Sequence, residues 1–95
     1  MRVTLSEMFN STHLGSRHNG EKVRELIKPH LDRGERVVLD FRRVEVATQA
    51  FLDEIFGIFV RAFGVEYIKG KLLIENTSPA IKQTINFVIS YSKKR

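Results

Sequence analysis

Apolar residues recur at helical spacing in three segments of the chain, and each segment begins at a residue that favours a helix N-terminus. Ser16 precedes the first segment, Thr48 the second and Ser78 the third. Pro79 directly follows Ser78, at the first helical position, where its missing backbone N–H costs nothing. The pattern therefore predicts three helices.

The first helix is predicted to start at about Arg17 and carries one apolar face. Pro29 lies inside this pattern, lacks a backbone donor and crowds the preceding turn, so we expect the helix to kink or end near Lys28. The face combines the following residues: Val23, Leu26, Ile27 and Leu31.

The second helix, from Gln49 to about Phe63, is unusually apolar. Its hydrophobic residues cover an arc of roughly 200°, about twice what a surface helix needs. Such a helix is wedged between neighbours or presents a face to another chain. We expect extra packing inside the fold, with a homodimer or partner face as the alternative. The polar stripe that remains consists of Asp53, Glu54, Gly57 and Arg61.

Three short apolar or alternating segments predict strands at Arg2–Leu5, Val37–Phe41 and Leu72–Ile74. The middle one begins with three consecutive apolar residues, Val37 to Leu39, rather than an alternating pattern, which is typical of a central strand covered on both faces. With the helices, the order is β-α-β-α-β-α. It predicts one α/β domain over residues 1–95, with a small mixed sheet that has parallel central strands and packs against about three helices.

Composition narrows the function classes. The 95 residues include 16 Lys and Arg against 11 Asp and Glu, so the formal charge is +5. That balance allows a nucleic-acid or an acidic protein partner, and the positive charges concentrate at Arg42-Arg43 and at Lys93-Lys94-Arg95. Cysteine is absent, which suits a reducing compartment and excludes disulfides and thiolate catalysis. With no signal-peptide or membrane-spanning pattern, we expect a cytoplasmic protein.

Catalytic motifs are missing. The sequence has no P-loop, nucleophile elbow, dinucleotide turn or metal-binding helix motif, so we expect neither an enzyme nor a bound cofactor or metal. His13 and His18 are predicted to be exposed loop residues, and His30 a partly buried, hydrogen-bonded core residue. Asp40 closes the central strand, where its carboxylate caps the following turn or faces a ligand at the carboxyl end of the sheet.

Thr48 has two interpretations. As an N-cap its hydroxyl accepts a bond from a helix amide, worth about 1 kcal/mol. As a phosphoacceptor it would place a dianion at the positive end of the helix. We favour the cap.

Four motifs together resemble the bacterial STAS-like domains of unknown function, which are related to sulfate transporter and anti-sigma factor antagonist domains. The resemblance runs from about Leu14 to Val88. Its residues are Leu14-Gly15-Ser16-Arg17, then Val37 to Val44, then Thr48-Gln49-Ala50-Phe51-Leu52-Asp53-Glu54-Ile55-Phe56, and Asn76 ahead of the last helix.

The resemblance implies a protein-interaction or regulatory module. In anti-sigma factor antagonists, a partner kinase phosphorylates a hydroxyl residue where this helix starts. On that pattern Gln49 and Ala50 occupy the serine positions here, and Thr48 falls one or two places earlier. The expected partner is another protein, an ATPase or kinase-like protein by analogy. Nucleic-acid binding and self-association are the alternatives. The expected partner-binding residues are Arg42, Arg43, Thr48, Gln49, Asp53, Glu54, Gly57 and Arg61.

Overall fold

The computed structural model describes residues 1–94, and it confirms the predicted α/β class. Three parallel strands form one sheet in the order β1-β3-β5, and a separate parallel pair joins β2 to β4. Among the described residues every strand pair is parallel. The elements in chain order are β1 (Arg2–Thr4), α1 (Leu5–Met8), β2 (His13–Leu14), α2 (Arg17–Asp32), β3 (Val37–Asp40), β4 (Val46–Ala47), α3 (Gln49–Leu52), the π-helical turn η1 (Asp53–Gly57), α4 (Ile58–Phe63), the 3-10 turn η2 (Val65–Tyr67), β5 (Leu72–Glu75) and α5 (Pro79–Lys93).

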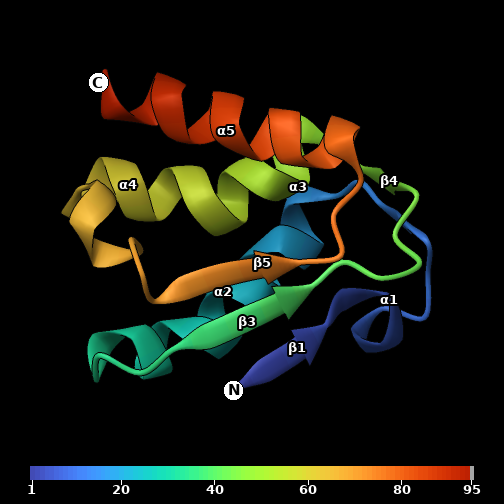
Figure 1. Cartoon of the computed structure of the whole chain (residues 1–95), viewed down its shortest axis with the longest axis horizontal. Coiled ribbons are helices and arrows are strands. Elements are labelled where there is room, and N and C mark those ends of the chain that lie inside the picture. The colour runs from blue at the N-terminus through green and yellow to red at the C-terminus, as the bar shows by residue number, and fades with distance from the viewer. Residues whose placement is uncertain (95) are drawn as a thin grey trace.

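The three-stranded sheet is covered on one face only, which corrects the expectation of a strand buried on both. The strands follow each other across the sheet in chain order, and right-handed crossovers in one direction place every connecting helix on the same side. Figure 1 shows the strands with no helix in front of them and α2 behind. Leu39 of β3 points inward and is fully buried, whereas its neighbour Val38 is half-buried and Leu73 of β5 is 38% exposed.

The predicted second helix is present as one continuous helical rod, α3–η1–α4, which begins at Gln49 and ends at Phe63. Its neighbours are α2 on one side and α5 on the other. Almost all of its apolar face is buried inside the chain, so the wide hydrophobic arc serves the fold itself. At the C-terminal end Ala62 and Phe63 remain exposed, Phe63 by 53%.

The helix α2 does not end near Lys28, which was one of the two outcomes expected from Pro29, but continues to Asp32. The bond that Pro29 cannot donate would have reached the carbonyl of Glu25, and both residues are exposed, so water can satisfy that carbonyl. The buried face continues across the proline from Ile27 to Leu31, and this packing holds the last turn in place. Leu26, assigned to the same face, is 41% exposed instead.

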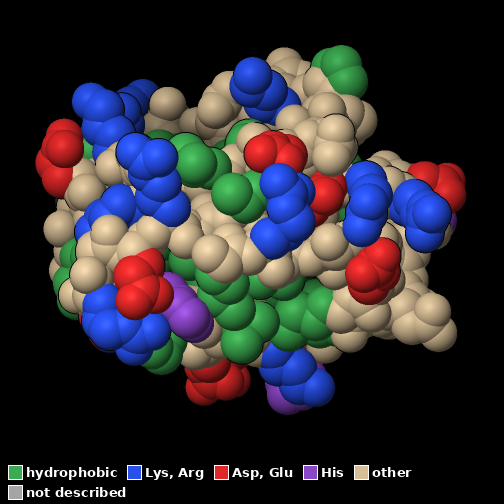
Figure 2. Space-filling view, turned by 60° about the horizontal axis from the view of Figure 1, so that its bottom comes forward, with side chains coloured by type: hydrophobic (Ala, Val, Ile, Leu, Met, Phe, Trp, Pro, Cys, Tyr) green, Lys and Arg blue, Asp and Glu red, His purple; other side chains and the backbone are tan. Residues whose placement is uncertain are grey.

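The exposed face of the sheet carries both apolar and charged side chains. Figure 2 shows hydrophobic side chains on this side of the molecule, interspersed with Lys, Arg, Asp and Glu. Arg2 of β1 crosses the face and pairs with Asp40 at 3.0 Å and with Glu75 at 2.8 Å. The arginine, the first residue of β1, thus ties that strand to the carboxyl ends of β3 and β5, where Asp40 and Glu75 lie.

Candidate functional site

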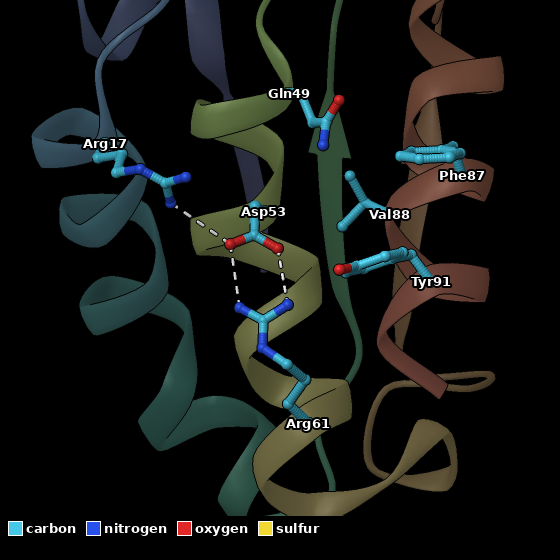
Figure 3. A pocket seen from close by; sticks show the side chains of 7 residues that line it. All are labelled: Arg17, Gln49, Asp53, Arg61, Phe87, Val88 and Tyr91. Atoms are coloured by element: carbon cyan, nitrogen blue, oxygen red, sulfur yellow. Dashed lines mark hydrogen bonds and ion pairs between the residues drawn. The ribbon is translucent and has the colours of Figure 1, made fainter. Parts of the chain in front are cut away.

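A groove lies between the start of the central helix and α5. Its volume is about 300 Å³, and it mixes charged residues on one wall with aromatic residues on the other. In Figure 3, Phe87, Val88 and Tyr91 point from α5 toward Gln49 and Asp53, and Arg17 approaches from α2. The lining residues are Arg17, Gln49, Asp53, Arg61, Phe87, Val88 and Tyr91.

The charged wall is built around Asp53. Its two carboxylate oxygens accept hydrogen bonds from the two terminal nitrogens of Arg61, at 2.8 Å and 3.0 Å, and Oδ2 also accepts one from Arg17 at 3.4 Å. The Arg61 hydrogen bond is the main cause that lowers the pKa of Asp53, and it raises the pKa of Arg61 in turn. The carboxylate is therefore ionised and committed to two guanidinium groups.

Gly57 provides the space for this ion pair. A Cβ at this position would lie 2.2 Å from Asp53 Oδ1 and 2.9 Å from Arg61 Nη1, far inside normal contact. The same guanidinium donates to the Oγ of Ser92 on α5 at 2.9 Å, and Ser92 is only 2% exposed. The pair thus lies across the bare backbone at Gly57 and joins the central helix to α5.

The π-helical turn was not predicted from the sequence. It occupies Asp53–Gly57, the segment that carries the polar stripe, and such single π turns are frequent at functional sites. The spacing of apolar residues could not reveal the π turn. One extra residue rotates the following side chains by only part of a helical turn, so the apolar face still looks continuous in the sequence. The ion pair and the π turn therefore coincide.

Glu54 is likewise used inside the chain. It accepts a 2.6 Å bond from Arg24 and a 3.1 Å bond from Arg17, and its side chain is only 13% exposed. Arg24 also donates to the Glu54 carbonyl at 3.1 Å. Of the two carboxylates that we expected to face a partner, Glu54 joins α2 to the central helix, whereas Asp53 is held mainly by Arg61 within the central helix.

The aromatic wall supplies the exposed part of the groove. Phe87 and Tyr91 are each 52% exposed, and their rings stack with centroids 6.1 Å apart and an angle of 22°. Our set of expected binding residues did not include them. The signal was present in the sequence, since both lie one turn apart on α5 beside its buried face. Gln49, which was expected at the site, lies opposite them and is exposed.

Thr48 occupies the N-cap position, as predicted. Its Oγ1 accepts a hydrogen bond from the amide of Phe51 at 3.2 Å and donates one to the carbonyl of Gly15 at 2.8 Å. The hydroxyl thus caps the central helix and also holds the loop before α2. Thr48 is half-buried and does not line the groove.

Arg42 and Arg43 lie outside the groove, at the carboxyl end of the sheet. Asp40 organises this region: its carboxylate accepts bonds from Asn76 Nδ2 and from the Arg42 amide, both at 2.9 Å, besides the pairing with Arg2. The Asn76 bond is the main cause that lowers the pKa of Asp40. Asp40 therefore caps the following turn, as the first of its two interpretations had it, and is 3% exposed.

The histidines do not form a metal site. His13 and His18 are exposed, as expected, but they lie in β2 and in the first turn of α2 rather than in a loop. His30 is partly buried and hydrogen-bonded, as expected, with its Nδ1 2.7 Å from Glu35 Oε1, although it lies outside the hydrophobic core. Among residues 1–94, no three His, Cys, Asp or Glu side chains come together as metal ligands. No helix in the same part of the chain has the length and hydropathy needed to cross a bilayer.

Comparison with known proteins gives a family and nothing closer. Neither the curated proteins nor the solved structures yielded a match. A match to the family described as STAS-like domain of unknown function covers residues 19–82, from the first turn of α2 to the first turn of α5. The matched range includes the central helix with its π turn and the cap at Thr48. Of the three-stranded sheet it includes β3 and β5, whereas β1 lies before it. Because this match spans most of the chain, the protein belongs to the STAS-like domains of unknown function.

Proposed function

We propose that the protein is a non-catalytic regulatory module that binds another protein through the groove between the central helix and α5. The exposed Phe87–Tyr91 stack beside Arg17 carries this proposal. Aromatic and arginine side chains contribute most to protein interfaces, because they bury large areas and lose little conformational freedom. Membership of a STAS-like family supports an interaction role.

The internal ion pairs make the groove a fixed surface rather than a set of mobile side chains. Asp53, Arg61 and Ser92 link its two walls, so the aromatic rings keep their position relative to the central helix. A preformed surface loses less entropy on binding than one that must order. A partner fits this groove with an apolar anchor against the rings and an acidic group near Arg17, which is 61% exposed.

The partner that the resemblance to anti-sigma factor antagonists favours is an ATPase or kinase-like protein, and the site of action would be the cytoplasm. To test this, the protein is used as bait in a nuclease-treated extract of its native host, and captured proteins are identified by mass spectrometry. The identified partner is then purified, and its dissociation constant is measured for wild type, Phe87→Ala and Phe63→Ala.

Phe63 is a matched control for Phe87. It is 53% exposed, and its ring packs on a tyrosine, Tyr67, with centroids 4.7 Å apart, but it lies at the far end of the central helix. We expect Phe87→Ala to weaken binding by about 30-fold, as for an interface anchor worth about 2 kcal/mol. Phe63→Ala should bind like wild type. Equal loss in both variants would contradict the proposal, and so would the loss of every captured protein when the extract is treated with nuclease.

Phosphorylation of Thr48 is a separate part of this proposal. A phosphoryl group on Oγ1 would break the bond to the Gly15 carbonyl and add negative charge beside the groove. Replacing Thr48 by Asp should then change the affinity for the purified partner, whereas Thr48→Ser should not. Equal binding by all three proteins would retain the interaction module and remove the switch.

A further inference from the structure

A second pocket lies at the carboxyl ends of β1 and β3, on residues that the groove does not use. Its volume is about 470 Å³, and all of its lining side chains are polar or charged. They come from α1, from the loop after it and from the turn after β3. The lining residues are Ser6, Glu7, Asn10, Ser11, Thr12 and Arg43.

Ser6 provides the first evidence that the pocket takes a ligand. The residue is 9% exposed, and within residues 1–94 its hydroxyl has no hydrogen-bond partner. In the same part of the chain, every side-chain nitrogen or oxygen that is fully shielded from solvent has a hydrogen-bond partner. The unpartnered Ser6 hydroxyl is therefore still in contact with solvent, and Ser6 lines this pocket. A nearly buried hydroxyl without a protein partner is suited to donate to a ligand.

Arg43 supplies the charge. Of the arginines in the described chain, only Arg36 and Arg43 form no ion pair, and of these two only Arg43 lines this pocket. The one carboxylate in the lining, Glu7, is already paired with Arg42 at 3.3 Å. The pocket therefore keeps an uncompensated positive charge.

The backbone around the pocket is held in an unfavourable conformation. Asn10 and Arg43 both have positive φ, at 48° and 65°, and the only other described non-glycine residue of this kind is Asn76. For arginine this region costs about 1 kcal/mol or more relative to a normal conformation. Glycine would adopt this conformation at position 43 without that cost. The backbone conformation therefore does not favour arginine here, and a role of the side chain in the pocket would explain it.

We propose that this pocket binds a phosphate-type oxyanion, with the Arg43 guanidinium and the Ser6 hydroxyl as its principal donors and the Asn10 amide beside them. An arginine with neutral hydroxyl and amide donors matches the several acceptor oxygens of a phosphate group. The Ser11 and Thr12 hydroxyls already bond to the backbone and ring of His13, so they line the site without being its main donors. The ligand is free phosphate or a phosphate ester on a larger molecule.

The test is a ¹⁵N NMR titration of the whole chain with inorganic phosphate, with phosphoserine and with sodium chloride at equal ionic strength. We expect saturable shifts in the amides of residues 6, 10–12 and 43 with phosphate and not with chloride. A lower dissociation constant for phosphoserine than for phosphate identifies a phosphate ester as the preferred ligand. A lower dissociation constant for phosphate identifies the free ion. Shifts that chloride reproduces would overturn the proposal.

Three variants separate a built site from general charge attraction. Arg43→Gln should weaken phosphate binding by about tenfold or more, and Ser6→Ala by a smaller factor, since charged donors form the stronger bonds. The matched control Arg36→Gln removes the other unpaired, exposed arginine, before the amino end of β3, and should leave binding unchanged. Equal weakening by Arg36→Gln and Arg43→Gln would refute the site. Because this pocket shares no residue with the groove, its failure leaves the proposed protein interaction untouched.

Discussion

Replacing Gly57 by Ala tests how the central helix is joined to α5. In an ordinary helix interior this change is favourable by about 1 kcal/mol, because alanine loses less backbone freedom on folding. Here the new methyl group would lie 2.2 Å from Asp53 Oδ1 and 2.9 Å from Arg61 Nη1. Real Cβ contacts essentially never fall below 3.0 Å, so the carboxylate and the guanidinium must move apart.

The size of the effect follows from what the pair contributes. Two charge-assisted hydrogen bonds join Asp53 and Arg61, and the Arg61 bond to Ser92 depends on the same guanidinium position. Hydrogen bonds to charged groups are worth about 1.5–3 kcal/mol each, and partial exposure of the pair (20% and 27%) reduces this. We take about 3 kcal/mol for the loss. Subtracting the helix gain of about 1 kcal/mol leaves a net destabilisation of about 2 kcal/mol.

The assay is urea unfolding at neutral pH together with a thermal melt. A net loss of about 2 kcal/mol lowers the Tm of a domain this size by roughly 8–16 °C. Gly15→Ala is the matched control, since its Cβ would meet only Thr48 Cγ2, at an ordinary 3.4 Å, and should change stability by less than about 0.5 kcal/mol. In an Arg61→Gln background, Gly57→Ala should cost much less. A Gly57→Ala protein as stable as wild type would refute the reasoning.

Three further predictions concern the supports of the fold. Thr48→Val removes the helix cap and the hydroxyl bond to the Gly15 carbonyl, so urea unfolding should show a loss of about 1–2 kcal/mol that Thr48→Ser largely avoids. Gly20→Ala would place a Cβ 2.6 Å from the backbone oxygen of Phe51, which cannot rotate away. We therefore expect the free energy of unfolding to fall by about 2 kcal/mol or more in the same assay, and a neutral result would show that α2 can shift. Asp40 has a folded pKa below its ordinary value of 3.8, so its stabilising contribution is present above that value and is lost as the pH falls through the lowered folded pKa. Thermal melts between about pH 6 and pH 2 should therefore show a shallower acid decline for Asp40→Asn than for wild type, and parallel curves would contradict this assignment.

The hydrophobic pattern was sufficient for the main elements. It located the three long helical segments and the three strands of the sheet, because each buries a regular set of apolar residues such as Ile27 or Leu39. It could not locate α1 and β2, since segments of two to four residues carry less than one full period. It also offered an end of α2 near Lys28 as one of two outcomes, and that outcome was wrong, because burial of the last turn outweighed one missing bond.

The candidate site was harder to predict than the fold. The polar stripe with Asp53 and Glu54 was located on the right helix, but the sequence does not show which charges are neutralised by residues far away in the chain. Arg17, Arg24 and Arg61 supply those partners, and only the packing of α2 against the central helix brings the first two close. The exposed rings of Phe87 and Tyr91 differ from the core only in which side of α5 they occupy.

The one-directional strand order has a consequence for how the chain folds. Arg2 pairs with Val38, and Val38 pairs with Leu73. Each strand of the main sheet therefore pairs with a strand that lies about one third of the chain away in sequence. No hairpin can start the sheet, and long-range parallel pairing is slow because a large loop must close first. The local turns of α2, the central helix and α5 must therefore form and begin to dock before the sheet does. In a refolding experiment, helical signal should precede protection of the β3 amides from hydrogen exchange.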